Sequence, residues 1–211
     1  MKNEVIREIN TLIERYPQLS NCQEDVIKAF ERIKESYLSG GKVLVCGNGG
    51  SAADSEHIVG ELMKCFKKKR PISEEIKSGL RCFKEGEKLA DCLEGSLPAI
   101  SLTSHLSLST AYSNDTEPSA VFAQQLFGLG KKGDTFIAIS TSGNSKNCVY
   151  ACIVARTLGL KTICLTGEKE SRLSALSDVS IRVPETETYK VQELHLPVYH
   201  TICAMLEEEF F

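Results

Sequence analysis

Five short apolar runs separated by helix-like segments are the feature that most limits how this chain folds. The runs are residues 42–46, 98–103, 134–140, 161–166 and 179–183, and none of them alternates cleanly between polar and apolar side chains. Continuous apolar runs of this length are typical of parallel strands buried on both faces. Because helical segments separate most of them, the sequence predicts a doubly wound α/β sheet with right-handed crossovers.

Two further helices are predicted before the first strand, at residues 3–16 and 22–38. In the first of them four apolar residues form one stripe: Ile6, Ile9, Leu12 and Ile13. This N-terminal region, residues 1–40, carries no motif of its own. It is interpreted as a packing or an oligomerisation element, and the sequence does not choose between the two.

The segment from Lys64 to Gly95 is longer than an ordinary crossover between a helix and the next strand. It has mixed charge and contains Pro71 and Gly79. Ser73 followed by two glutamates is a typical helix start. We therefore expect residues 64–95 to be an inserted helical crossover that covers an edge of the sheet or a site.

Length and composition indicate one globular domain over residues 1–211, with 42% hydrophobic residues. The apolar run Phe136–Ile139 is far too short to span a membrane, and the first ten residues lack the apolar core of a signal peptide. These features predict a cytoplasmic protein that binds no membrane.

The nine cysteines include no Cys-x-x-Cys pair. Their odd number and the absence of a secretory signal predict reduced, structural thiols rather than disulfides or a zinc knuckle. The net charge of −3 favours neither nucleic acid nor anionic lipid as a partner. The basic run 67–70 is soon followed by Glu74 and Glu75, so it is interpreted as a solvated surface.

Glycine-rich and serine-rich loops follow two of the predicted strands. The first loop is Cys-Gly-Asn-Gly-Gly-Ser at residues 46–51, and a helix is expected to start near Ser51. The second is Ser-Thr-Ser-Gly-Asn-Ser at residues 140–145, before a helix near Lys146. Free amides and hydroxyls at a helix N-terminus favour an anion, and ligands of open α/β sheets bind at the carboxyl ends of strands. The sequence therefore predicts a phosphate cradle, although either loop taken alone could be a plain turn.

Side chains suited to proton transfer or metal binding occur on two predicted helices. His57 and Glu61 are four residues apart, and Gln192 and His200 are eight apart, so each pair can share one helix face. These four side chains could ligate a divalent metal or serve as acid and base. The alternative is that His57 pads a surface and His200 is a satisfied core histidine.

Taken together, the two loops, the His57/Glu61 pair and the segment 191–200 resemble the sugar isomerase (SIS) family, most of all its phosphoheptose isomerases. The resemblance covers residues 1–64 and 96–211. It implies a three-layer αβα sandwich with a five-stranded parallel sheet, of flavodoxin-like or Rossmann-like type, with added N-terminal helices. It also implies a homotetramer whose active sites are shared between subunits.

The implied activity is isomerisation of sedoheptulose 7-phosphate to D-glycero-D-manno-heptose 7-phosphate through an enediol. By resemblance, Glu61 and His200 are the acid/base pair, and zinc, one ion per site, is the expected cofactor. The implied metal ligands are His57, Glu61, Gln192 and His200. The implied substrate-binding residues are Asn48, Gly49, Gly50, Ser51, Asn114, Asp115, Ser140, Thr141, Ser142, Ser145 and Gln192.

Two departures qualify the resemblance. The 64–95 crossover is expected to lead toward the sugar-binding strand ends, which leaves the sugar open. Pro197, between Gln192 and His200, is expected to kink or restart the helix. Two alternative functions stay open at this point: a non-catalytic sugar-phosphate-binding or replication-initiation-associated SIS scaffold, and another SIS chemistry such as an etherase or an amino-sugar isomerase.

Overall fold

A five-stranded parallel sheet forms the centre of the computed structural model, which describes all 211 residues. The strand order is β2-β1-β3-β4-β5, and every neighbouring pair is parallel. The strands are β1 (Val43–Gly47), β2 (Ala99–Ser101), β3 (Thr135–Ile139), β4 (Lys161–Thr166) and β5 (Val179–Arg182). All five lie within or next to the runs predicted from the sequence, so the predicted fold class is confirmed.

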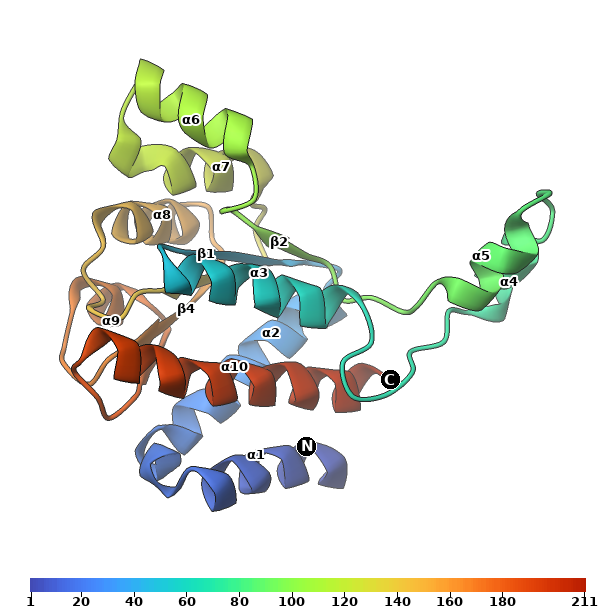
Figure 1. Ribbon diagram of the computed structural model, residues 1–211, viewed down its shortest axis with the longest axis horizontal. Helices are drawn as coiled ribbons and strands as arrows, with labels where there is room; N and C mark the ends of the chain where they lie inside the picture. The colour runs from blue at the N-terminus through green and yellow to red at the C-terminus, as the bar shows by residue number, and fades with distance from the viewer.

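Helices cover both faces of the sheet (Figure 1). One face packs against α2 (Gln23–Leu38), α3 (Gly50–Met63) and α10 (Thr188–Phe210), with α1 (Asn3–Arg15) against α10. The other face packs against α7 (Val121–Leu129), α8 (Lys146–Thr157) and α9 (Arg172–Leu176), with α6 (Leu106–Asp115) outside α7. Two 3-10 helices complete the chain at Pro17–Cys22 and Pro118–Ala120. None of the helices is both long and apolar enough to cross a bilayer.

Alternate residues of each strand enter different cores, which explains why the strands are apolar throughout. Val43 and Val45 belong to the core under α2, α3 and α10, whereas Leu44 and Cys46 belong to the core under α7 and α8. All four are fully buried. A parallel sheet covered on both faces selects this pattern, because successive side chains point to opposite faces.

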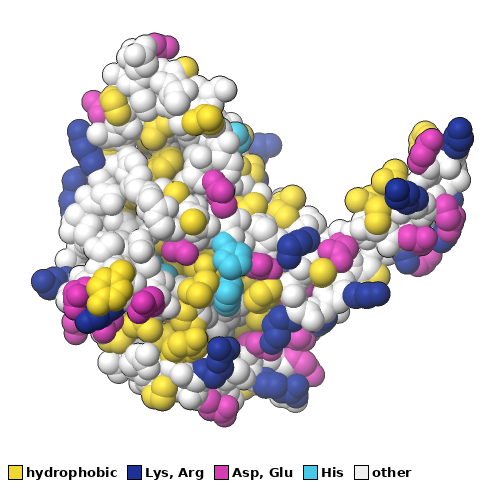
Figure 2. All heavy atoms as spheres, in the orientation of Figure 1, with side chains coloured by type: hydrophobic (Ala, Val, Ile, Leu, Met, Phe, Trp, Pro, Cys, Tyr) yellow, Lys and Arg dark blue, Asp and Glu magenta, His cyan; other side chains and the backbone are white.

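Two short helices, α4 (Glu74–Leu80) and α5 (Gly86–Cys92), form an arm, residues 71–94, that stands away from the body (Figure 1). The Ser73 hydroxyl caps α4, as the sequence predicts. The side chains of Ile76 and Phe83 remain 53% and 72% exposed, so the arm has almost no core of its own. Apolar and charged side chains both line it in Figure 2.

The arm corrects one expectation, since it does not lead to the sugar-binding ends of the strands. Helix α3 starts at the carboxyl end of β1 and runs back along the sheet. The chain that follows it therefore emerges at the amino ends of the strands. At the root of the arm, Pro71 and Glu94 form an isolated antiparallel bridge, and the Gly95 amide donates to the Arg70 carbonyl over 2.6 Å.

The expected restart of the helix at Pro197 is also wrong, because α10 is one continuous helix from Thr188 to Phe210 with Pro197 inside it. Proline removes the bond to the carbonyl of Glu193, a residue that is exposed, so water can serve that carbonyl. Pro197 itself is buried, and its own carbonyl accepts a hydrogen bond from the Thr201 hydroxyl over 2.8 Å. Packing against α1, α2 and α3 outweighs the local preference of proline.

Candidate active site

The first loop makes a tight turn between β1 and α3. Gly49 has a φ of +57°, which glycine adopts without strain. A Cβ atom at Gly47 would lie 2.4 Å from the Ser51 carbonyl oxygen, so only glycine fits there. The amides of Asn48 and Gly49 donate to no backbone carbonyl. Free amides at the start of a 14-residue helix provide the donors and the dipole that an anion needs.

The second loop makes a similar turn between β3 and α8. Ser140 and Ser145 place their hydroxyl oxygens 2.9 Å apart, so both point to one place. The amides of Thr141, Ser142 and Ser145 donate to no backbone carbonyl. Hydroxyls and free amides therefore converge at the N-terminus of α8, in the arrangement predicted from the sequence.

A pair of amide side chains joins the two loops. Asn48 donates to the Oδ1 atom of Asn147 over 2.9 Å, and Asn147 donates to the Oδ1 atom of Asn48 over 2.8 Å. Strands β1 and β3 are neighbours in the sheet, so the loops at their carboxyl ends lie side by side. The two hydrogen bonds between Asn48 and Asn147 join the two turns into one cradle. Sequence reasoning missed Asn147, although its place just after Ser145 was a signal.

Gln192 lies against the first loop, whereas the other predicted residues of α10 lie further along the helix. A Cβ atom at Gly50 would be 2.6 Å from Nε2 of Gln192, so the amide rests directly on the first turn of α3. His200 lies two turns further along α10, next to His57 of α3. The two helices therefore run side by side, and one common face of α10 meets α3, as predicted.

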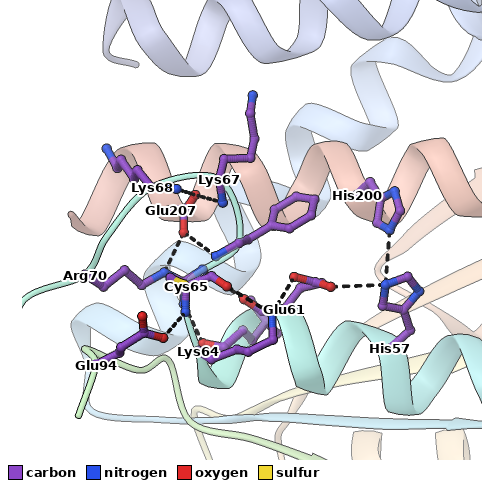
Figure 3. A network of polar contacts seen from close by, with 12 residues as sticks. His57, Glu61, Lys64, Cys65, Lys67, Lys68, Arg70, Glu94, His200 and Glu207 are labelled. Carbon is purple, nitrogen blue, oxygen red and sulfur yellow. Dashed lines mark hydrogen bonds and ion pairs between the residues drawn. The ribbon is translucent and has the colours of Figure 1, made fainter. Parts of the chain in front are cut away.

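His57 is the centre of the second half of the site (Figure 3). Its Nε2 atom is 3.1 Å from Oε1 of Glu61 and 3.5 Å from Nε2 of His200. Glu61 is largely buried, with 12% of its side chain exposed, whereas the side chain of His57 is 42% exposed. Histidine side chains are visible at the middle of the molecular face in Figure 2, so solvent and small molecules reach them.

Tyr199 and Asp54 fix the His57 ring. The Tyr199 hydroxyl donates to Oδ1 of Asp54 over 3.2 Å and lies 3.1 Å from Nδ1 of His57. Since the hydroxyl proton points to Asp54, the hydroxyl oxygen accepts from His57, which assigns the His57 proton to Nδ1. The lone pair of Nε2 then faces Glu61 and His200. The contact of Tyr199 with Asp54 and its role in fixing His57 were not predicted.

Burial and neighbours shift the pKa values of several groups in this cluster. Burial, with the nearby His57, lowers the pKa of His200 below its usual value, while Glu61 opposes this change. Burial raises the pKa of Asp54, against the effects of Tyr199 and His57. Burial and the Asp54 carboxylate raise the pKa of Tyr199. The lowered pKa of His200 favours its neutral form, and a neutral imidazole can accept a proton.

Asn114 and Asp115 end α6 and hydrogen-bond to each other over 2.8 Å. No hydrogen bond joins them to either loop or to the histidines. The segment that follows them does approach the cradle, because Lys146 at the start of α8 lies 3.8 Å from Glu117. The predicted contact of Asn114 and Asp115 with a sugar therefore stays a prediction.

The predicted metal ligands are only partly assembled. His57, Glu61 and His200 are neighbours, while Gln192 lies two turns away over Gly50. No three His, Cys, Asp or Glu side chains are grouped so that they could hold a metal ion as placed. The two separations around Nε2 of His57, 3.1 and 3.5 Å, nevertheless match the roughly 3.3 Å between ligand atoms of a tetrahedral zinc ion.

The arrangement combines an anion cradle with groups that exchange protons. The cradle lies at the N-termini of α3 and α8, and the glutamate and histidines lie two to three turns further along α3. A phosphorylated molecule bound by its phosphate would extend toward Glu61 and His200. Anchoring at one end and acid/base chemistry at the other suits a small phosphorylated substrate with a mobile proton.

The profile of the SIS domain matches residues 6–81 and 81–167, more than half of the chain. The chain belongs to the SIS domain family. Its curated relatives include phosphoheptose isomerases: that of Aliarcobacter butzleri is 37% identical over 99% of this chain and 98% of its own length. That of Akkermansia muciniphila is 31% identical over 100% and 99%.

Solved structures give the same result. A phosphoheptose isomerase from Francisella tularensis superposes with a TM-score of 0.75 at 28% identity, covering 99% of this chain and 100% of that one. The enzyme from Neisseria gonorrhoeae superposes with a TM-score of 0.72 at 31% identity, covering 97% and 94%. The predicted family and fold are confirmed. The two matched segments of the profile meet at residue 81, inside the arm.

Proposed function

We propose that this chain is a phosphoheptose isomerase, which interconverts sedoheptulose 7-phosphate and D-glycero-D-manno-heptose 7-phosphate. The family and the near full-length similarity to phosphoheptose isomerases support the activity. The observation that carries it is the approach of both Glu61 and His200 to the Nε2 atom of His57, beyond a cradle for a phosphate. A protein that only bound a sugar phosphate would need the cradle alone.

The reaction moves one proton between two adjacent carbons of the sugar. One group of the Glu61/His200 pair removes a proton from C1 of the ketose and so forms an enediol, and a proton is returned at C2. The hydroxyl proton passes from O1 to O2, so that the ketone becomes a hydroxyl and C1 becomes the aldehyde. A carboxylate and a neutral imidazole suit these transfers near neutral pH.

The cradle residues would hold the phosphate and orient the sugar. We assign the phosphate to Ser51, Ser140, Ser142 and Ser145 with the amides of Gly49, Gly50 and Thr141, since these donors converge at two helix N-termini. Asn48, Asn114, Asp115 and Gln192 are assigned to the sugar hydroxyls. Binding energy from the phosphate would then align C1 and C2 with the acid/base pair.

We further propose a zinc ion held by His57, Glu61 and His200, with Gln192 as the remaining predicted ligand. The Nε2 lone pair of His57 faces a carboxylate oxygen at 3.1 Å, and two acceptors at that distance call for a proton or a cation between them. Tyr199 and Asp54 hold the opposite side of the ring, as outer partners of metal-bound histidines do. When bound, the metal would polarise the sugar carbonyl.

A homotetramer with shared active sites is also proposed. Large apolar side chains lie exposed on α6 and α7, with Leu106 at 74% and Phe127 at 65% exposure. Exposed apolar groups of this kind mark surfaces that pair with another molecule. Light scattering should give four times the chain mass of 23.2 kDa, and a monomer would contradict the proposal. The nine free thiols fit a reducing compartment, so we place the enzyme in the cytoplasm.

The test of function is turnover of sedoheptulose 7-phosphate by protein purified without chelator, with product detected as the aldoheptose phosphate. Elemental analysis of the same sample tests for zinc. Product formation confirms the assignment. No product at high enzyme concentration, with or without added zinc, removes the heptose activity and favours a non-catalytic SIS scaffold. An active enzyme that contains no metal would contradict the zinc proposal.

A further inference from the structure

A buried ion pair joins the ends of the two helices that carry the acid/base groups (Figure 3). Glu207, near the end of α10, accepts from Nε of Arg70 over 2.7 Å, and both side chains are fully buried. The same carboxylate accepts from the backbone amides of Phe66, Lys67 and Lys68 over 2.8, 2.8 and 3.2 Å. These four hydrogen bonds occupy all the lone-pair sites of the two carboxylate oxygens of Glu207.

The other two nitrogens of the Arg70 guanidinium hold α3. Nη2 donates to the carbonyl oxygen of Glu61 and Nη1 to that of Leu62, each over 2.8 Å. Helix α3 ends at Met63, so these carbonyls belong to its last turn and lack partners within the helix. Arg70 thus fastens the backbone of Glu61 itself to α10.

The link formed by Arg70 and Glu207 lies close along both helices to the residues of the acid/base site. Glu207 follows His200 by seven residues, which is about two helical turns, so the two side chains lie on one face. On α3 the contact is made at Glu61, four residues after His57. A shift of α3 along α10, or a rotation of either helix, would break the link and change the approach of Glu61 to His200.

Stability alone does not explain a fully buried ion pair. Removing two charges from water costs about as much as their attraction returns, and well-packed apolar residues in the same place are often equally or more stabilising. What the pair adds is a fixed geometry, because a planar guanidinium with three partners accepts only one arrangement. The partners here are the two helices whose relative position sets the site.

We propose that Arg70 and Glu207 are positioning residues of the isomerase, which set the register of α3 against α10 so that Glu61 and His200 face the same substrate carbons. This inference rests on the proposed isomerase function. Neither residue touches the cradle, which lies at the other end of α3. Loss of the link should therefore lower kcat while KM changes little.

The main experiment compares the wild type with Arg70→Lys and with the double variant Arg70→Met/Glu207→Met. The double variant leaves no unpaired buried charge, but the carbonyls of residues 61–62 and the amides of residues 66–68 lose their side-chain partners, so its folding transition is measured first. If the double variant does not fold, Arg70→Lys carries the test, and a wild-type kcat in that variant would then overturn the proposal. We expect kcat for sedoheptulose 7-phosphate to fall at least about tenfold in the double variant, with KM within about threefold. Arg70→Lys, which keeps the charge but has one nitrogen, should fall between the double variant and the wild type.

The matched control is Glu208→Gln, which removes the neighbouring ion pair with Lys68 (2.9 Å) at the same helix end. The Glu208 carboxylate accepts no hydrogen bond from the backbone amides of residues 66–68, so kcat should stay at the wild-type value. A double variant that folds and turns over at the wild-type rate would overturn the proposal. A uniform loss in which KM rises as much as kcat falls would also overturn it, because that pattern indicates general loosening.

A readout without turnover separates this proposal from the proposed function. In ¹⁵N-histidine NMR spectra, the double variant should shift the ring signals of His57 and His200 and leave those of His105 and His195 in place. If the wild type shows no isomerase activity, the function is wrong, and the spectra still decide whether the link positions the two histidines. Unchanged His57 and His200 signals in the double variant would overturn the proposal that this link positions the two histidines.

Discussion

Asn48 and Asn147 exchange two amide hydrogen bonds, of 2.9 and 2.8 Å, across 99 positions of the sequence. Each residue belongs to a different strand–loop–helix unit, so the pair fixes the distance between the two helix N-termini that face the ligand. A phosphate needs donors from both turns at once. The amide pair is therefore expected to matter for binding more than for folding.

Asn147→Ala tests this relationship. Loss of two partly exposed hydrogen bonds should weaken the alignment of the loops by about 1–2 kcal/mol. KM for the sugar phosphate should rise by roughly five- to thirtyfold, with kcat nearly unchanged. Steady-state kinetics check the result, and Asn21→Ala, at an exposed position outside the two loops, serves as the control. An unchanged KM in Asn147→Ala would show that the loops hold their positions without the link.

Glu61→Gln and His200→Gln should each lower kcat by about 10² or more, because each removes one partner of the proton transfer while keeping a similar shape. Binding of inorganic phosphate should persist in both variants, since the cradle lies elsewhere. Single-turnover kinetics and a phosphate titration are the measurements. A variant with near-normal kcat would remove its residue from the acid/base role.

Gly143→Ala should damage the second loop. Gly143 has a φ of +64°, and a Cβ atom there would lie 2.0 Å from the Ser171 hydroxyl. We expect a loss of about 1–3 kcal/mol in unfolding free energy, together with a higher KM. Gly128→Ala, at an exposed position of α7 with open space around it, is the matched control and should be neutral or stabilise by up to about 1 kcal/mol. Equal unfolding free energies for the two variants would refute the strain argument.

The buried His195 should make folding sensitive to acid. Burial lowers its pKa from 6.5 to about 4, against the hydrogen bond to the Thr166 carbonyl. Between these values the unfolded chain takes up a proton that the folded chain does not, so the unfolding free energy falls as pH falls through this window. From pH 7 to pH 5 the loss from this residue is about 2 kcal/mol.

Denaturant unfolding of the wild type and of His195→Gln at several pH values measures this effect. The variant lacks the titrating group, so its unfolding free energy should depend less on pH between 6.5 and 4. Parallel curves for the two proteins over that range would show that His195 does not cause the acid sensitivity.

Local patterns were sufficient to predict the strands, the two loops and the starts of α3 and α8. A buried parallel strand and a glycine turn at a helix start leave marks within a few residues, as at 42–51 and 134–146. The shared face of Gln192 and His200 followed from helical spacing alone. The catalytic and metal roles of these residues still await the experiments above.

Long-range contacts could not be predicted in this way. Tyr199 meets Asp54 across 145 positions, and Glu207 meets Arg70 across 137. No local pattern marks such partners, because they depend on how two helices pack. The same limit explains the error at Pro197, where contacts from three other helices decide the outcome, and the direction of the arm, which depends on where α3 ends.

The separation of 143 residues between His57 and His200 has a consequence for how the protein folds. Closing so large a loop is entropically expensive, so contacts of high sequence separation tend to form late. The two phosphate turns, which are 99 positions apart, need only the chain from β1 to α8, whereas the proton-transfer pair also needs α10, the last element of the chain, to dock beside α3. Refolding experiments should therefore recover phosphate binding before enzymatic turnover.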